Sequence, residues 1–340
     1  MYNEFYGFSE KPFEISPDPK FLYLTSSLRE ALDAMVKGIK NRQGVISITG
    51  EVGTGKTTLI YYLLMILDDK VKTAFIFHPS ITFEELLEII LREHYIEVTG
   101  KDKQTLLNQF IEYLLHIGSD ETMAVIIDEA QHLSKETLEE LGKLSECFEA
   151  MTPVRLKIIF VGQPEFEDIL NLSGLKIISQ QIVIKRKIKA LTDEESREYI
   201  EHRLKLVGSI ASQIFTPKAI SAVTIYAQGR PRVINIVCDN ALMSSFTESK
   251  KKIDEKIILE VIKNLEGPSH RAFMPMRIFR FVKRTNLIRH KRILTPQIMA
   301  EYNSNPSIHI LDFISQKQIA VIFMLLLGLV VIVFLMWTSP

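Results

Sequence analysis

Short apolar runs alternate with amphipathic stretches through the first half of the chain. The runs have the length of strands and are rich in β-branched residues: VISITG (45–50), TAFIF (73–77), MAVIID (123–128), LKIIFVG (156–162) and QQIVIK (180–185). The stretches between them repeat apolar residues at helical spacing, as residues 103–117 do. This alternation predicts an α/β fold, a parallel sheet with helices on both faces.

After residue 190 the strand pattern stops and helical patterns continue. Thr192 and Glu195 form a capping box, and Thr216 followed by Pro217 is an N-cap with proline at the first helical position. Two more helical patterns cover about 232–246 and 254–265. These signals predict a second, small and all-helical domain behind the α/β core.

The last part of the chain differs from both. Residues 267–318 contain four prolines and the polar run NSNPS, which is typical of a linker. Residues 319–337, IAVIFMLLLGLVVIVFLMW, have no charge and no polar face. A helix of this length rises roughly 28 Å, close to the hydrocarbon thickness of a bilayer. A buried core helix normally keeps a polar face, so the segment predicts a single transmembrane helix.

Five segments follow from these patterns. They are an N-terminal segment that docks on the core (1–44), the α/β core (45–189), the helical lid (190–266), a basic linker (267–318) and the transmembrane helix (319–337).

The formal net charge of zero results from two oppositely charged parts of the chain that cancel each other. From residue 267 onward there are nine Lys or Arg and two Asp or Glu, which leaves seven excess negative charges on residues 1–266. Residues 271–292 hold eight of these basic residues and no acid, interleaved with Phe, Ile and Leu. This mixture predicts contact with anionic lipid, at about 1 kcal/mol per basic residue. Nucleic acid phosphates are the other anion it could bind, but the nearby membrane helix disfavours them.

The distribution of charge also predicts an orientation in the membrane. Basic residues precede the predicted membrane helix and no charged residue follows it. The positive-inside rule then places the body of the chain in the cytoplasm and the C-terminus outside. The two cysteines, Cys147 and Cys238, lie far apart in apolar surroundings, which predicts two buried thiols and neither a disulfide nor a metal site.

The strongest motif is GEVGTGKTT (50–58), which follows the first predicted strand and precedes a helical pattern. Its glycines let backbone amides turn around a phosphate group, and a helix N-terminus favours the same anion. Lys56 places a charge on the β- and γ-phosphates, and Thr57 supplies a hydroxyl ligand for Mg²⁺. The predicted phosphate-binding residues are Gly50, Glu51, Val52, Gly53, Thr54, Gly55, Lys56, Thr57 and Thr58.

A second motif, MAVIIDEAQHL (123–133), carries two acids at the end of a strand. The strand brings Asp128 to the carboxyl edge of the sheet, where ligands collect in open α/β folds. Asp128 is predicted to hold Mg²⁺ through water, and Glu129 to polarise an attacking water as a general base. Alone, two acids after a strand are commonly solvated; the phosphate-binding motif upstream favours the catalytic interpretation.

Two further polar residues are weaker candidates. Gln163 ends the fourth predicted strand, where it could reach a γ-phosphate or orient water, or could simply form a turn. Arg232, or less favourably Arg230, opens a lid helix and could reach the phosphates. The alternative for either arginine is local capping of helix carbonyls.

Together these residues resemble an AAA+ ATPase of the general secretion pathway protein A type. The resemblance runs from the first residues to about 266 and includes GEVGTGKTT, IDEAQHL, VGQPE, TDEESREYIEHRL and GRPRVINIVCDNAL. It implies an α/β ATPase core with a helical lid, ATP and Mg²⁺ as ligands, and a ring-type homo-oligomer. It further implies Lys56, Thr57, Asp128 and Glu129 as nucleotide and catalytic residues, with Gln163 as first sensor and Arg232 as second sensor. Members of this family act at the inner face of the bacterial inner membrane and help to assemble an envelope secretion complex.

The sequence departs from the family pattern at two points. Gln181 stands where relatives carry an arginine that is a candidate finger for a neighbouring subunit's nucleotide, and Lys185, Arg186 or Lys187 are possible substitutes. Since loss of such a finger can cost several orders of magnitude in turnover, a switch that binds ATP without efficient hydrolysis is the alternative function. The second difference is expected after the membrane helix, where family members commonly continue into a peptidoglycan-binding envelope domain and only Thr338, Ser339 and Pro340 follow here. A DNA-binding helper ATPase is a third, less favoured possibility.

Overall fold

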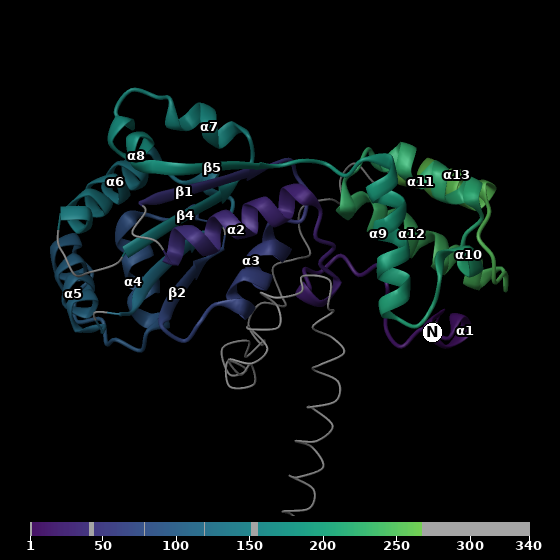
Figure 1. Ribbon diagram of the computed structural model, residues 1–340, viewed down its shortest axis with the longest axis horizontal. Coiled ribbons are helices and arrows are strands. Elements are labelled where there is room, and N and C mark those ends of the chain that lie inside the picture. The colour runs from purple at the N-terminus through teal and green to yellow at the C-terminus, as the bar shows by residue number, and fades with distance from the viewer. Residues whose placement is uncertain (1, 41–43, 78, 119, 151–155, 267–340) are drawn as a thin grey trace, which may run out of the picture. The chain divides into compact units, whose positions relative to one another are not determined.

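The computed structural model describes residues 2–40, 44–77, 79–118, 120–150 and 156–266. Its centre is a five-stranded parallel sheet with the order β2-β3-β4-β1-β5 (Figure 1). The strands are β1 (Val45–Gly50), β2 (Val71–Ile76), β3 (Thr122–Ile127), β4 (Leu156–Gly162) and β5 (Ile182–Ile188). Every residue of β1, β3 and β4 is buried, as expected for strands covered on both faces. The predicted parallel sheet is confirmed.

Helices cover both faces of this sheet. One face packs on α2 (Ser26–Lys40) and α3 (Lys56–Ile66), which share a hydrophobic cluster with Ile46 and Ile48 of β1. The opposite face packs on α4 (Phe83–Glu93), α5 (Lys103–His116), α6 (Lys135–Ala150), α7 (Glu165–Leu170) and α8 (Lys176–Gln181). The cap residues Thr82 and Asp102 fix where α4 and α5 begin, since each accepts a backbone hydrogen bond from the first turn.

The fifth strand lies further along the chain than its apolar residues predict. The pattern indicates 180–185, but β5 covers Ile182–Ile188, and Gln181 belongs to the end of α8. β5 is an edge strand that continues to pair with β1 through Lys185, Arg186 and Lys187. These three residues are exposed. Charged residues are common on edge strands because they discourage pairing with other chains, so the apolar pattern ends before the strand does.

The second unit is the helical lid, built from α9 (Asp193–Leu206), α10 (Ala211–Ile214), α11 (Pro217–Ala227), α12 (Pro231–Thr247) and α13 (Glu255–Glu266). Thr192 and Glu195 form the predicted capping box at the start of α9. Thr216 caps α11 by accepting from the backbone N–H of Ala219 at 3.2 Å. Residues of all five helices share one hydrophobic cluster, which is separate from the two clusters of the sheet.

The N-terminal segment, predicted to dock on the α/β core, divides its contacts between the core and the lid. α2 does pack on the α/β core, but residues 2–21, here called the N-terminal strap, contribute to the hydrophobic cluster of the lid. The strap contains α1 (Tyr2–Tyr6) and the short 3-10 helix η1 (Pro19–Phe21). Its aromatic residues meet aromatic partners on the lid, as Phe5 does with Phe246 at 5.4 Å between ring centroids. Apolar residues in a sequence do not reveal which apolar surface they will cover.

A buried arginine of the lid binds this strap. Arg203 of α9 is 5% exposed. Its guanidinium donates to the Tyr199 hydroxyl at 2.7 Å, to the carbonyl oxygen of Glu14 at 3.4 Å and to that of Pro12. It also lies 4.5 Å from the ring centroid of Phe21, in cation–π geometry. One lid side chain therefore binds the strap at three points.

The predictions for the membrane helix and for the two cysteines remain to be compared with the structure. No helix within the described residues is long and apolar enough to cross a bilayer, and the predicted membrane helix, like the basic linker before it, lies outside those residues. Cys238 is buried as predicted, but the prediction for Cys147 is wrong, because this thiol is exposed. α6 turns Leu144 and Phe148 inward, and Cys147 falls on the opposite side.

Candidate nucleotide-binding site

The loop between β1 and α3 has the backbone that a phosphate-binding loop requires. Gly53 and Gly55 have φ values of 78° and 96°, in the left-handed region that favours glycine. A Cβ atom at Gly53 would lie 2.8 Å from the Cβ of Arg232, and one at Gly50 would lie 3.0 Å from the carbonyl oxygen of Ile188. A side chain is therefore opposed by both the backbone and the packing at Gly53, by the backbone alone at Gly55 and by the packing alone at Gly50.

Lys56, the first residue of α3, lies inside this loop and is 5% exposed. Its ammonium group donates to the carbonyl oxygens of Gly50 at 2.8 Å and of Glu51 at 2.9 Å. Burial lowers the pKa of Lys56, while the nearby carboxylates of Glu129 and Asp128 act in the opposite direction. The loop thus holds a desolvated cation among acceptors that phosphate oxygens can replace.

Thr57 and Asp128 face each other next to this cation. The Thr57 hydroxyl donates to Oδ2 of Asp128 at 2.6 Å, and Asp128 is fully buried at the end of β3. Burial raises the pKa of Asp128, and the hydrogen bond from Thr57 opposes that shift. A hydroxyl and a carboxylate oxygen are ligands that Mg²⁺ accepts together with phosphate oxygens and water. The described residues contain no group of three His, Cys, Asp or Glu that could hold a metal unaided.

Glu129 follows Asp128 with a left-handed backbone, at φ 52°. Its Oε2 accepts from the side-chain amide of Gln131 at 2.5 Å and from that of Gln163 at 3.1 Å. Burial alone would raise the pKa of Glu129, but these two amides and the charge of Lys56 lower it. The carboxylate is therefore ionised at neutral pH, as a general base must be before it accepts a proton.

The lid reaches the same loop through α12. The backbone N–H of Arg232 donates to the carbonyl oxygen of Gly53 at 3.2 Å, and its Nε is buried with no hydrogen-bond partner among the described residues. Arg230 instead donates to the carbonyl oxygen of Ala227 at 3.1 Å, which is the local capping that the sequence analysis left open. Of the two arginines, Arg232 is the one beside the phosphate-binding loop.

Comparisons with known proteins agree with this geometry. Residues 39–170 match the family described as AAA domain, and these residues include the phosphate-binding loop, Asp128, Glu129 and Gln163. The chain is 35% identical over 255 residues to general secretion pathway protein A of Aeromonas hydrophila, across 74% of this chain and 46% of the relative. It is an AAA protein related to general secretion pathway protein A. The chain spans about half the length of that curated relative.

Solved structures show the same fold at low sequence identity. The ORC1 protein of Aeropyrum pernix in complex with DNA has a TM-score of 0.58 and 14% identity, over 76% of this chain and 70% of that one. CDC6P from Pyrobaculum aerophilum has a TM-score of 0.58 and 17% identity, over 73% and 71%. The ORC2 protein of Aeropyrum pernix, with ADPNP and ADP, has a TM-score of 0.55 and 18% identity, over 71% and 66%. These similarities establish the fold of the AAA domain and its lid.

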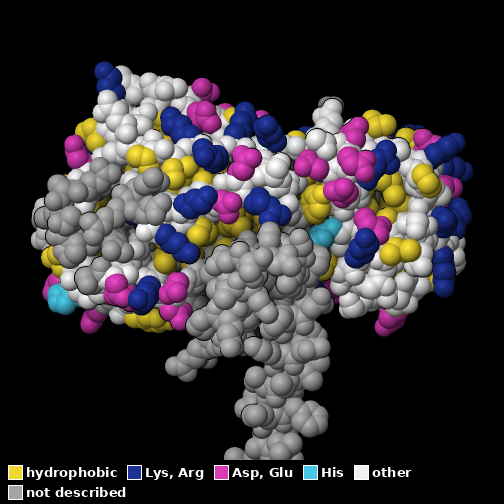
Figure 2. Space-filling model, viewed as in Figure 1, with side chains coloured by type: hydrophobic (Ala, Val, Ile, Leu, Met, Phe, Trp, Pro, Cys, Tyr) yellow, Lys and Arg dark blue, Asp and Glu magenta, His cyan; other side chains and the backbone are white. Residues whose placement is uncertain are grey.

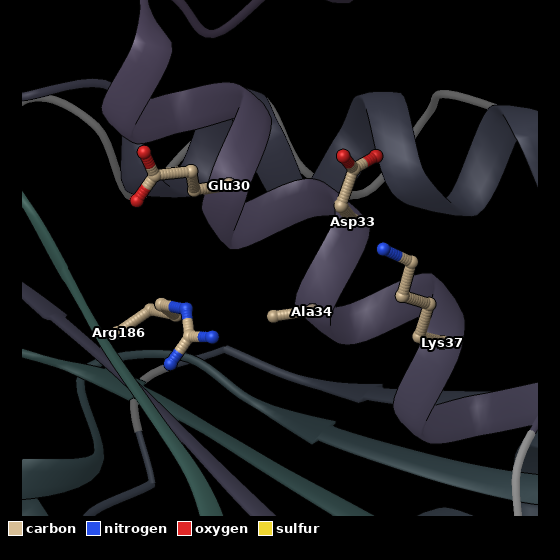
Figure 3. A pocket seen from close by; sticks show the side chains of 5 residues that line it. All are labelled: Glu30, Asp33, Ala34, Lys37 and Arg186. Carbon is tan, nitrogen blue, oxygen red and sulfur yellow. The ribbon is translucent and has the colours of Figure 1, made fainter.

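Gln181 and its possible substitutes, Lys185, Arg186 and Lys187, lie elsewhere on the α/β core, on α8 and β5. The side-chain amide of Gln181 donates to the carbonyl oxygen of Gly142 at 3.1 Å, so it is bound within its own subunit. Lys185, Arg186 and Lys187 are exposed on β5, along which dark blue basic side chains lie in Figure 2. Arg186 points toward α2, where it lines a shallow cavity of about 410 Å³ with Glu30 and Lys37 (Figure 3). No hydrogen bond among the described residues connects these side chains to the phosphate-binding loop.

The structure brings Gly50, Lys56, Thr57, Asp128, Glu129, Gln163 and Arg232 to one edge of the sheet. It also brings in Gln131, which the sequence analysis did not select. Gln131 lies in the 3-10 helix η2 (Ala130–His132), and its partners come from the ends of β3 and β4. Its position two residues after Glu129, in a turn at the sheet edge, is the signal that could have identified it.

Proposed function

We propose that this chain is a membrane-anchored AAA ATPase. It uses the binding and hydrolysis of ATP to assist the assembly or remodelling of a cell-envelope complex. The observation that carries the hydrolytic part is the position of the Glu129 carboxylate, which accepts hydrogen bonds from Gln131 and Gln163 beside the Thr57–Asp128 pair and the buried ammonium group of Lys56. The relationship to general secretion pathway protein A supports the envelope role.

Each residue of the site has a defined task in this proposal. Backbone amides of the loop 50–55 and the ammonium group of Lys56 bind the phosphates of ATP. Thr57 and, through water, Asp128 would hold Mg²⁺, which neutralises charge on the phosphates when it is bound. Glu129 accepts a proton from the attacking water. Gln163 orients that water or contacts the γ-phosphate, and Arg232 contacts the phosphates from the lid.

The alternative is a nucleotide-gated switch with negligible turnover. Gln181 supports it, because an amide that is bound to Gly142 of its own subunit supplies no cation to a neighbouring nucleotide. In that case ATP binding would change the lid through Arg232 and recruit a partner. A ring-type homo-oligomer, which we also propose, matters for the first function and not for the second.

Turnover as a function of protein concentration separates the two functions. We expect ATP hydrolysis per subunit by the full chain to rise with concentration, to fall to background in Lys56→Ala and to fall to a small residual rate in Glu129→Gln. Binding of ATP should be lost in Lys56→Ala and retained in Glu129→Gln. Tight binding with background turnover at every concentration would replace the ATPase proposal with the switch.

The membrane part of the proposal rests on residues 267–337. We propose a single-pass protein of the bacterial cytoplasmic membrane, with the AAA domain in the cytoplasm, the C-terminus outside and residues 271–292 on anionic lipid. The chain should resist carbonate extraction from membranes, and a cysteine placed at Ser339 should react with an impermeant thiol reagent from the outside. Release by carbonate would contradict the anchor without affecting the ATPase proposal.

Binding to DNA is the less favoured alternative. Its support is the fold shared with proteins whose structures contain DNA and the basic residues of 271–292. Salt-dependent DNA binding by the full chain, lost when these basic residues are replaced by glutamine, would favour it over lipid binding.

A further inference from the structure

Gln131 is held at both ends of its side chain. Its Oε1 accepts from the backbone N–H of Gln163 at 3.0 Å, and its Nε2 donates to Oε2 of Glu129 at 2.5 Å. A backbone N–H can only donate, so the end of the amide that faces Gln163 must be the oxygen. The NH2 group therefore faces Glu129, and the orientation of the amide is fixed by its partners.

The surrounding backbone packs closely against the Gln131 side chain. Gly162, the last residue of β4, approaches Gln131 so closely that a Cβ atom there would lie 2.8 Å from Oε1 of Gln131. On the other side, the left-handed backbone of Glu129 turns its carboxylate toward the amide. Gln131 is thus a spacer between the ends of β3 and β4.

The two oxygens of Glu129 have different surroundings. Oε2 accepts from Gln131 and from Gln163, whereas no hydrogen bond among the described residues uses Oε1. An oxygen with two amide donors has little capacity for another, so Oε1 is the oxygen that remains for water.

We propose that Gln131 is a positioning residue for the hydrolytic reaction: it fixes the Glu129 carboxylate so that Oε1 faces the attacking water. This inference rests on the proposed ATPase function and deepens it. Gln131 also ties that orientation to Gln163, because one side chain contacts the backbone of Gln163 and the carboxylate of Glu129. A displacement of Gln163 by the nucleotide would therefore reach Glu129 by two routes, directly through the Gln163 amide and indirectly through Gln131.

A double-mutant cycle in the full chain tests the role. Gln131→Met keeps the length of the side chain and removes both hydrogen bonds. We expect it to lower kcat about 10- to 100-fold, with the KM for ATP within about twofold of wild type, because misplacing a catalytic group by about 1 Å costs on this order. In the Glu129→Gln background, measured under single-turnover conditions, the same change should cost nothing further.

Two results would overturn the proposal. One is a kcat of Gln131→Met that equals or exceeds that of wild type. The other is an equal fold-loss in the Glu129→Gln background, which would indicate a structural effect independent of the carboxylate. Gln131→Glu is the companion variant, since it keeps an acceptor for Gln163 but loses the donor to Glu129, and we expect it to lose kcat as Gln131→Met does.

Amide hydrogen exchange at Gln163 gives a readout that does not need turnover. Exchange should accelerate in Gln131→Met, which removes the acceptor of this N–H, and remain near wild type in Gln131→Glu. Unchanged exchange in Gln131→Met would overturn the proposal. If the wild-type chain has no turnover, the ATPase function fails while this exchange measurement still tests the contact. If the wild type hydrolyses ATP and Gln131→Met matches it, the positioning role alone fails.

Discussion

Buried polar groups serve different purposes at the nucleotide-binding site and in the lid. At the site, Lys56 donates to loop carbonyls, and Thr57 and Asp128 bind each other. A nucleotide with Mg²⁺ can replace each of these bonds. In the lid, Arg203 donates to carbonyls of the N-terminal strap, and the Tyr199 hydroxyl donates to Asn235 at 2.9 Å. No ligand replaces those bonds.

This difference predicts which buried groups contribute to ligand binding and which contribute to the stability of the fold. A buried cation whose partners are exchangeable costs folding free energy that is recovered on binding, whereas a buried cation that holds two chain segments together contributes to folding itself. Removing the first should impair binding and leave the fold intact. Removing the second should destabilise the fold and leave the chemistry of the site unchanged in the folded protein.

The largest effect on stability should come from Arg203. Arg203→Met removes hydrogen bonds to Tyr199, Pro12 and Glu14 and leaves buried acceptors without donors, so we expect a loss of about 3 kcal/mol in the free energy of unfolding. Urea denaturation measures it. Lys205→Met is the control on the same helix, because Lys205 is exposed and its ion pair with Glu201 should contribute less than about 0.5 kcal/mol. Equal losses in the two variants would contradict the role of Arg203.

Lys56 should show the opposite behaviour. Lys56→Met is expected to weaken ATP binding about 100-fold, or about 2.7 kcal/mol, because it removes charge-assisted contacts to the phosphates. The free energy of unfolding without nucleotide should change by less than about 1 kcal/mol, since the variant also removes a desolvated charge. Calorimetric titration and urea denaturation give the two values. A large loss of stability would show that Lys56 also maintains the fold.

A smaller effect is expected where the lid joins the core. Gly229 has φ 70°, and a Cβ atom there would lie 2.0 Å from the carbonyl oxygen of Leu191. Gly229→Ala should cost about 2 kcal/mol, from the left-handed backbone and from the clash. Gly208→Ala is the matched control, with φ 84° and no atom within 4 Å of the new Cβ, and should cost about 1 kcal/mol. Thermal unfolding measures the stability of both variants. The loss in Gly208→Ala gives the cost of the left-handed backbone, and the additional loss in Gly229→Ala gives the cost of the clash with Leu191.

The smallest effect depends on pH. Desolvation of the carboxylate at the edge of β2 raises the pKa of Glu93 to about 7, although the residue keeps an exposed surface and its hydrogen bond from the Phe75 N–H acts in the opposite direction. Below the pKa of the unfolded chain, near 4.5, both states are protonated and Glu93 contributes nothing. Between these two pKa values the unfolded chain releases the proton while the folded state keeps it, so stability falls as pH rises from about 4.5 to about 7 and stays constant above 7. Glu93→Gln should therefore be more stable than wild type at pH 8, by about 1 kcal/mol after allowance for solvent screening, and equal to it below the pKa of the unfolded chain. A difference that does not vary with pH would refute this origin.

The sequence predicted those features that depend on neighbouring residues. β1 and β4 begin and end where their apolar runs do, because strands buried on both faces need a continuous apolar run. The phosphate-binding loop is contiguous, so its residues could be recognised together. The caps at Thr192 and Thr216 depend on residues three positions away and are likewise local.

Features that depend on distant partners were missed or misplaced. Gln131 contacts Gln163 because β3 and β4 are neighbouring strands. The residues around Gln131 in the sequence do not indicate that these two strands pair. Tyr2, Phe8 and Phe13 of the N-terminal strap could pack on any apolar surface. Their packing on the lid is accompanied by the hydrogen bond from Arg203 to the strap, and Arg203 lies almost 200 positions away in the sequence. The charged part of β5 is a strand because β1 pairs with it.

The location of the strap has a consequence for synthesis of the chain on the ribosome. Tyr2 is fully buried and its hydroxyl binds Asp239, 237 positions later in the sequence. At about 5 to 20 residues per second, roughly 10 to 50 s pass between the emergence of these two residues. During that interval the α/β core can fold, while the aromatic residues of the N-terminal strap still lack their partners in the lid. The strap is therefore among the last of the described segments to reach its final position.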